Sequence, residues 1–132
     1  MAGEAAWVVV PPDVGAPDAR ANGALRAPVV DPLATARRLA PAIRAAADEI
    51  ERTRRIPEPL LADLFASGLL HLFLPKALGG SEAEPGTYFR TIAEVARHDA
   101  SVGWNMFVAN SAALIAPHLD PAAARTIYAG GK

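Results

Sequence analysis

Two polar residues, Asn110 and Ser111, interrupt the most apolar stretch of this 132-residue chain and are its first candidates for a binding site. A polar side chain inside an apolar helix must form a hydrogen bond or lose roughly 1 to 3 kcal/mol of stability. In one reading, both side chains line a cavity. In the other, Ser111 bonds back to the carbonyl one turn earlier and Asn110 bridges to a neighbouring helix. The residues themselves leave both readings open.

The three histidines do not suggest a metal centre. His71, His98 and His118 lie far apart in the sequence, so we expect no zinc site among them. His98 stands next to Asp99, and the two either form an orienting pair or have separate roles at a helix end. The second reading is favoured, because a cationic imidazole is favourable at the end of a helix without any catalytic task.

Neither the serines nor the glycines indicate catalysis or nucleotide binding. Ser67 and Ser111 lack the strand-turn-helix setting that exposes a hydrolase nucleophile. Gly79 and Gly80 lack the spacing and the preceding strand of a phosphate-binding loop. We interpret this glycine pair as a turn that requires a positive φ angle.

The composition excludes several classes of partner. The chain is 52% hydrophobic and 20% charged, with a formal net charge of −1, so it has no strong field to attract nucleic acid or anionic lipid. It has no cysteine for disulfides or thiolate ligands. No run reaches the ~18 apolar residues of a membrane-spanning helix, and the first residues lack the basic start of a signal peptide. We therefore expect a cytoplasmic protein without nucleic-acid or membrane partners.

The elements that must position these residues begin near Asp31. Residues 1 to 30 contain four prolines and no sustained helical or strand period, so we expect a disordered or mobile N-terminal arm. Asp31 and Pro32 predict the cap and first turn of a helix, which should kink or properly begin at Pro41. Its exposed face should carry three ion pairs at four-residue spacing: Arg44 with Asp48, Asp48 with Arg52, and Glu51 with Arg55.

Four more helices are predicted from apolar spacing, prolines and glycines. They cover about residues 57–68, 85–98, 101–119 and 120–130. Residues 69–74 are nearly all apolar and should form buried extended chain. The helix over 101–119 is apolar on nearly every face, so we expect it to be the central element, enclosed by the others. The fold class is therefore all-α, a bundle of about five helices, with residues 31–132 forming one domain.

Three segments in the predicted order resemble the N-terminal helical domain of the acyl-CoA dehydrogenase superfamily. RRIPEPLLADLFASGLL resembles a family helix with a small-residue-and-glycine stop, and LPKALGGSEAEPG is similar to the family's proline-to-double-glycine loop. IAEVARHDASVGWN follows at the family's spacing, and ARTIYAGG resembles the helix before its middle domain. The resemblance covers residues 39–130, about the last two-thirds of the chain.

The resemblance implies that the parent protein is an FAD-dependent oxidoreductase acting on an acyl-CoA or another small molecule. In this family a β-rich middle domain and a C-terminal helical bundle hold most FAD contacts and the carboxylate base, and the bundle usually forms a homotetramer. Both parts are absent from this chain, which we expect to wall the substrate and flavin pocket and to be inactive alone. No catalytic, cofactor-binding or metal-binding residue is assigned.

The resemblance also identifies three candidates for the substrate cavity. Asn110 and Ser111 coincide with a polar pair that faces this cavity in relatives. Trp104 lies one helical repeat before Ser111 and faces the same way. These three residues are the predicted site.

Two alternatives accompany this assignment. Trp104 and the DASVGW segment resemble the superfamily's flavin-dependent monooxygenases, which hydroxylate organic substrates. However, the ALGG loop lacks an aromatic residue that relatives often place before the glycines, and the polar pair stands where many monooxygenases have a histidine near the flavin. The second alternative is a non-enzymatic helical module that binds another protein through an apolar groove.

Overall fold

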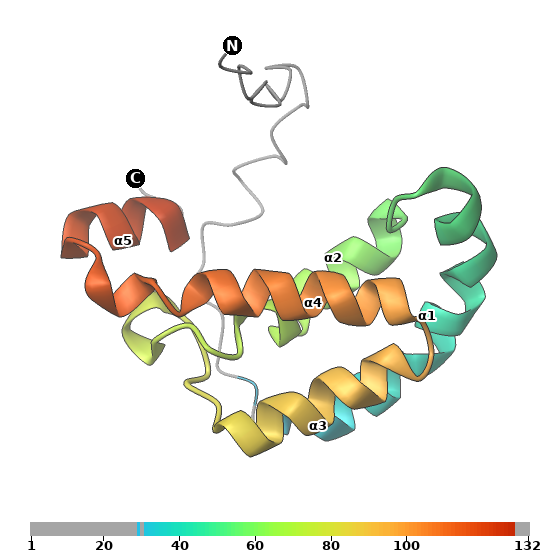
Figure 1. Cartoon of the computed structure of the whole chain (residues 1–132), viewed down its shortest axis with the longest axis horizontal. Helices are drawn as coiled ribbons and strands as arrows, with labels where there is room; N and C mark the ends of the chain where they lie inside the picture. The colour runs from blue at the N-terminus through green and yellow to red at the C-terminus, as the bar shows by residue number, and fades with distance from the viewer. Residues whose placement is uncertain (1–28, 30, 129–132) are drawn as a thin grey trace, which may run out of the picture.

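The computed structural model describes Val29 and residues 31–128, and every regular element within these residues is a helix (Figure 1). The α-helices are α1 (Pro32–Thr53), α2 (Glu58–Ala66), α3 (Pro85–Ala96), α4 (Ala100–Ala113) and α5 (Pro121–Tyr128). Single 3₁₀ turns connect them: η2 (Leu69–His71), η3 (Lys76–Leu78) and η4 (Ala116–His118). The prediction of an all-α bundle of about five helices is confirmed. Apart from Val29, the predicted N-terminal arm lies outside the described residues.

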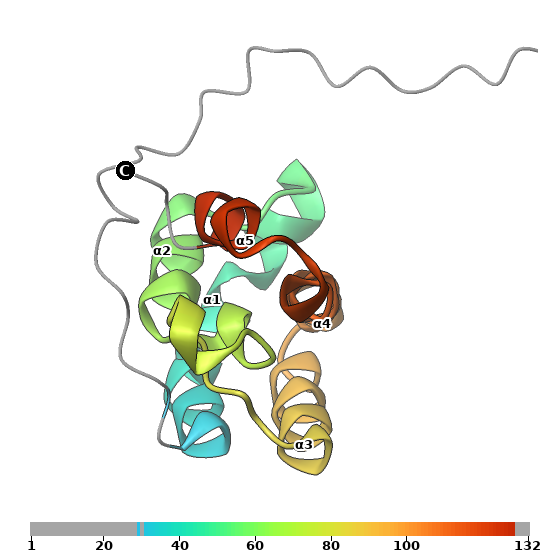
Figure 2. The same cartoon turned by 90° about the vertical axis from the view of Figure 1, so that its left-hand side faces the viewer.

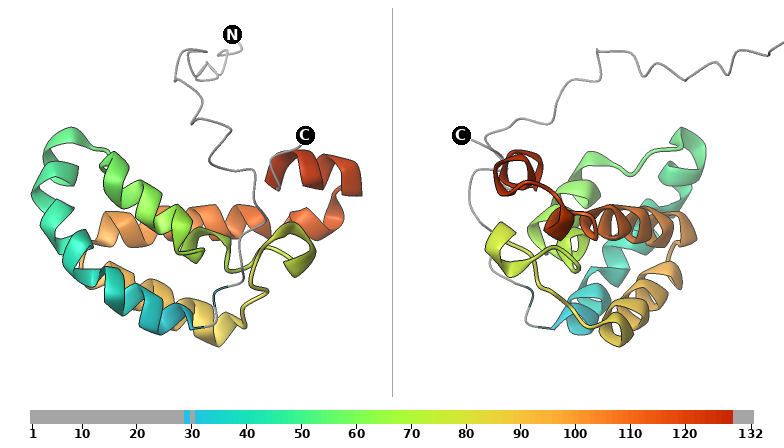
Figure 3. Two further views of the ribbon diagram at one scale, coloured as in Figure 1. Left: turned by 180° about the vertical axis from the view of Figure 1, so that it is seen from behind. Right: turned by 60° about the vertical axis from the view of Figure 1, so that its left-hand side comes forward.

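The longest helix, α1, begins where the sequence predicts and continues through Pro41. The Asp31 carboxylate accepts a hydrogen bond from the Ala34 amide at 2.9 Å, and Pro32 occupies the first turn. Pro41 lies inside the helix without ending it, and the α1 ribbon curves along its length (Figure 3). The start is therefore at Pro32 and not at Pro41.

The ion pairs predicted along α1 are wrong. Within α1 and its C-cap the described pair joins Glu51 to Arg54 at 3.1 Å, at three-residue spacing. Arg44 instead donates from Nη1 to Nδ1 of His98 at 2.8 Å. The reason is that α1 and α3 pack side by side, so partners across the seam compete with partners one turn away on the same helix.

The centre of the fold is the run from Leu69 to Leu74, not α4 as predicted. Leu69 and Leu72 are fully buried, and η2 contacts α1, α2 and α4, which surround it (Figure 2). The run is not extended chain either, because it starts with a 3₁₀ turn after Gly68, whose φ of 77° lies in the left-handed region. That turn lets neighbouring leucines enter the core, whereas extended chain would point them to opposite sides.

Asn110 supplies hydrogen bonds that this irregular central run needs. Its Oδ1 accepts from the amides of Leu72 at 2.6 Å and Phe73 at 3.3 Å. Its Nδ2 donates to the carbonyls of Leu69 and Met106, both at 2.9 Å. A buried backbone group without a partner costs about 1–3 kcal/mol. The fully buried Asn110 therefore stabilises the central run and fixes the face that α4 turns inward.

Only one side of α4 is buried, so the prediction that this helix is enclosed on all sides is wrong. The buried residues of α4 are Val102, Gly103, Met106, Asn110 and Ala113. On the opposite side, Trp104 is 65% exposed and Val108 is 47% exposed. An apolar face shows that a helix avoids water, but it does not show which part of a protein covers that face.

The predicted glycine turn is confirmed at Gly79, whose φ is 83°. Gly80 is required for a different reason. A Cβ at Gly80 would lie 1.9 Å from the carbonyl oxygen of Leu74, so no other residue fits without a backbone shift. The glycine pair thus holds the 75–84 loop against the central run.

A glycine also sets the spacing between α3 and α4. A Cβ at Gly103 would lie 2.7 Å from the Cβ and 3.0 Å from the Cα of Ala96. These contacts are shorter than atoms tolerate, and the Cα cannot rotate away. The two helices therefore touch at this point only because position 103 has no side chain.

We expect Gly103→Ala to destabilise the fold, whereas Gly86→Ala should not. The added methyl overpacks the α3–α4 contact, which should cost about 1–3 kcal/mol and outweigh a helix-propensity gain of about 1 kcal/mol. A Cβ at Gly86, on the same helix pair, would meet only the flexible end of Arg90 at 3.5 Å. Urea denaturation of both variants measures the difference, and equal stabilities would contradict the close contact.

Asn110→Ala should lower the free energy of unfolding by about 3 kcal/mol, because it leaves buried amides and carbonyls unpaired. Asn105→Ala is the matched control on α4. Asn105 is exposed and donates to its own helix, to the Ser101 carbonyl at 2.8 Å, so its loss should cost less than about 0.5 kcal/mol. If urea denaturation gives both variants the same free energy of unfolding, Asn110 does not support the central run.

Candidate functional site

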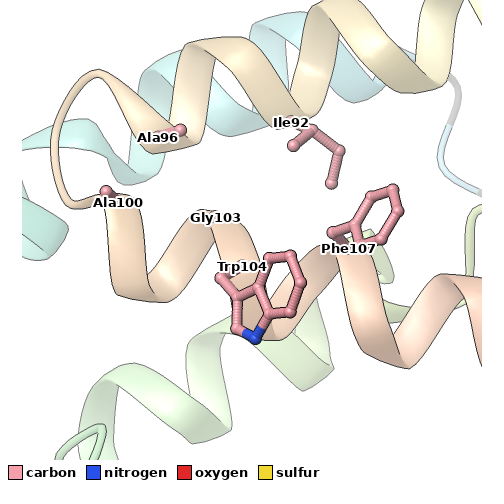
Figure 4. Close-up of a pocket in the computed structure, with 6 residues that line it drawn as sticks. All are labelled: Ile92, Ala96, Ala100, Gly103, Trp104 and Phe107. Carbon is pink, nitrogen blue, oxygen red and sulfur yellow. The ribbon is translucent and has the colours of Figure 1, made fainter.

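A pocket of about 260 Å³ lies between α3 and α4 (Figure 4). Its lining comprises Ile92 and Ala96 from α3 with Ala100, Gly103, Trp104 and Phe107 from α4. Every side chain there is apolar apart from the indole nitrogen of Trp104 (Figure 4). Because Trp104 is largely exposed, the pocket opens to solvent. Such a lining suits an apolar ligand and not an ion.

Small residues near the α3–α4 connection give the pocket its shape. Asp99 caps α4 by accepting from the amides of Ser101 at 2.8 Å and Val102 at 2.9 Å, so α4 starts within four residues of the end of α3. Ala96 and Gly103 then allow the helices to touch. Further along, larger side chains fill the space between the helices and form the other end of the pocket (Figure 4).

Four aromatic rings of α3 and α4 contact one another in succession, and we call Phe89, Tyr88, Phe107 and Trp104 the aromatic row. Neighbouring ring centroids lie 5.1 Å apart for Phe89 and Tyr88, and 6.3 Å apart for Tyr88 and Phe107. Trp104 stacks on Phe107 at 5.7 Å with an interplanar angle of 22°. The rings at the two ends, Phe89 and Trp104, are more than half exposed. Their open faces can stack against a planar ligand.

Two hydroxyl groups donate hydrogen bonds to one backbone carbonyl, that of Phe107 in the aromatic row. The carbonyl oxygen of Phe107 accepts from Ser111 Oγ at 2.8 Å and from the Tyr88 hydroxyl at 3.2 Å. Burial raises the pKa of the Tyr88 phenol above its ordinary value, and a hydrogen bond with the Ser111 side chain lowers it by a smaller amount. Tyr88 is therefore a neutral hydrogen-bond donor at physiological pH.

The structure separates the three predicted cavity residues. Trp104 lines the pocket, and Ser111 continues the same face of α4 seven residues later, roughly 10 Å along the helix. Asn110 points into the core and uses both ends of its amide there, away from the pocket. For Asn110 and Ser111, the hydrogen bonds match the second reading of the sequence, a bridge to a neighbouring segment and a bond to the preceding turn.

His98 and Asp99 have separate roles. Asp99 caps α4, while the His98 ring lies between two helices. Its Nδ1 accepts from Arg44, and its Nε2 lies 3.4 Å from Oε1 of Glu94, one turn earlier on α3. A guanidinium only donates, so Nδ1 of His98 is the acceptor in this bond. His98 is thus a packing residue, held by a Glu94 contact that the sequence analysis did not consider.

Clusters of metal-ligating residues and membrane-spanning helices are absent from the residues that the structure describes. Residues 29 and 31–128 contain no group of three or more His, Asp or Glu side chains that could hold a metal ion. Within the same ranges, no helix is long and apolar enough to cross a membrane. The α3–α4 groove is therefore the candidate ligand site among these residues.

Most of the pocket lining was not singled out from the sequence. Ala96, Ala100 and Gly103 recur at three- and four-residue spacing across the helix connection. This pattern of small residues is the signal that two helices approach closely there. It identifies a contact, but the pocket beside the contact follows only from the three-dimensional arrangement.

Comparison with known proteins agrees with the helical architecture. Residues 33–122 match the family described as acyl-CoA dehydrogenase, N-terminal domain. Three curated relatives are monooxygenases or their subunits by name. The oxygenase subunit HsaA of a flavin-dependent monooxygenase from Rhodococcus jostii is 33% identical over 66 residues, which cover 50% of this chain and 17% of that protein.

A dibenzothiophene monooxygenase from Rhodococcus erythropolis is 41% identical over 73 residues, 55% of this chain and 18% of that protein. A dibenzothiophene monooxygenase from Rhodococcus qingshengii matches to the same extent. The matched part of the chain thus spans less than a fifth of the length of these relatives. The family match itself covers most of the chain, from the start of α1 to the start of α5. The chain therefore belongs to the acyl-CoA dehydrogenase family and represents its N-terminal domain.

Proposed function

We propose that this chain is the N-terminal domain of an FAD-dependent monooxygenase, in which the α3–α4 groove walls the substrate pocket. The observation that carries the proposal is the exposed Trp104, stacked on the partly buried Phe107 beside a pocket of about 260 Å³. A planar ring is stabilised by stacking on such a surface, whereas a flexible acyl chain cannot stack. The names of the relatives also favour oxygenation over dehydrogenation of an acyl thioester.

The substrate that best fits this wall is a planar, mostly apolar organic molecule. Apolar side chains surround the pocket, and Trp104 presents an exposed aromatic ring beside them. Dibenzothiophene, in the name of three relatives, is a molecule of this kind and is a suitable probe. In the reaction, the chain's own residues would orient the ring and keep water away from it.

The described residues suit a wall of the pocket better than a complete flavin site. The diphosphate of FAD is commonly bound by free amides at a helix N-terminus. Asp31, Asp99 and Asp120 already occupy the first turns of α1, α4 and α5 with carboxylates. We infer that FAD, which supplies the redox chemistry when bound, is held mainly by parts of the parent protein beyond this chain. The same parts would form the contacts of a homotetramer, which we expect to work in the cytoplasm.

The 132-residue chain alone should neither retain FAD nor oxygenate dibenzothiophene. The expectation follows from the small apolar pocket and from the carboxylates at the starts of α1, α4 and α5. Gel filtration after mixing with FAD measures retention, and product formation with reduced flavin and oxygen measures turnover. Flavin that co-elutes with the chain and supports turnover would contradict the assignment as one wall of a larger site.

A chimera tests the proposed role directly. Residues 33–122 should replace the corresponding part of the Rhodococcus erythropolis dibenzothiophene monooxygenase and preserve flavin-dependent oxygenation. Trp104→Ala in the chimera should lower kcat/KM roughly tenfold, equivalent to about 1.4 kcal/mol of lost transition-state binding. Arg38→Ala, at an exposed position on α1, should leave kcat/KM unchanged.

Two results would argue against the proposal. One is a chimera that folds and binds FAD but oxygenates nothing. The other is an active chimera whose kcat/KM is insensitive to Trp104→Ala, since the groove would then not contact the substrate. Flavin absorbance of the purified chimera separates both cases from simple misfolding.

A further inference from the structure

The face of α4 that borders the pocket is apolar at one end and carries a hydroxyl group at the other. The pocket lies near the helix connection, and the aromatic row leads from Trp104 through Phe107 towards Tyr88. At Tyr88 and Phe107 the row reaches the Ser111 hydroxyl. Trp104 and Ser111 share one face of α4, separated by roughly 10 Å along the helix axis. A rigid molecule of two or three fused rings can span this length.

Ser111 is the polar group best placed to meet such a molecule. Its side chain is half-buried, so part of it remains accessible, and it lies on the face of α4 that carries Trp104. Tyr88 is only 1% exposed, and both ends of the fully buried Asn110 amide form hydrogen bonds with the central run. Neither of these two neighbours can reach a ligand without leaving its present partners.

The hydroxyl of Ser111 can act towards a ligand in one direction only. Its proton is donated to the Phe107 carbonyl at 2.8 Å, one turn earlier on α4, and its oxygen also meets the Tyr88 side chain. A serine oxygen retains lone pairs after donating its single proton. The group therefore presents an acceptor and has no second proton to offer.

We propose that Ser111 is a specificity-determining residue that accepts a hydrogen bond from a hydroxyl or amine group on a planar substrate. The rings of that substrate stack against Trp104 while its donor group meets Ser111. This inference rests on the proposed function, because it takes the groove as the substrate wall. It adds that the groove prefers a ring system with a hydrogen-bond donor over one of equal shape without a donor.

A matched pair of ligands tests this preference. The full chain carrying Trp7→Phe retains one tryptophan, so the indole N–H resonance of Trp104 reports binding without ambiguity. Titration with 2-naphthol and with 2-methoxynaphthalene compares two similar ring systems, of which only the first has a donor. We expect 2-naphthol to bind about three- to tenfold more tightly, the worth of one neutral hydrogen bond.

Variants at position 111 complete the test. Ser111→Ala should remove the preference and leave the affinity for 2-methoxynaphthalene unchanged, while Ser111→Thr should retain it, since threonine also has a hydroxyl. Equal affinities of the parent chain for the two ligands, or a preference that survives Ser111→Ala, would overturn the role of Ser111 while leaving the groove as a binding site. If neither ligand shifts the Trp104 resonance, the proposed function fails together with this inference.

Discussion

The hydrogen bonds between Asn110 and the central run are the constraint on which the rest of the structure depends. Residues 69–74 pass through the core without the regular ladder of a helix, so their amides and carbonyls need partners from elsewhere. Asn110 provides them from α4, with bonds to Leu69, Leu72 and Phe73. A helix pinned at one side chain cannot rotate, and the orientation of every other residue of α4 follows from this.

The exposed position of Trp104 is the main consequence of that orientation. With Asn110 facing inward, Trp104 lies about a third of a turn away around the helix, on the side that nothing else in the described chain covers. Gly103 lies between these two directions and meets Ala96, so α3 borders the exposed face closely. The result is a groove with an apolar pocket, stacked aromatic rings and a hydroxyl group, which requires further protein to become an enclosed site.

The helices could be predicted from the sequence because their signals are local. Asp31 marks a start and Gly68 a stop through hydrogen bonds and φ angles that depend on neighbouring residues. The failures concern contacts between elements. The pairing of Arg44 depends on α3 lying beside α1, and the direction of Asn110 depends on the central run. Trp104 could be proposed from the family resemblance, but its exposure could not, because composition cannot distinguish burial by this domain from burial by another.

The account's central claim is that the open face of α4 receives the ring system of a substrate. A crystal structure of the chain with dibenzothiophene tests it most directly, because the sulfur atom locates the ligand by its anomalous scattering. The account predicts one sulfur position in the α3–α4 groove, with the ligand rings stacked against Trp104. A ligand bound elsewhere on the domain, with the groove unchanged and Trp104 free of contact, would contradict it.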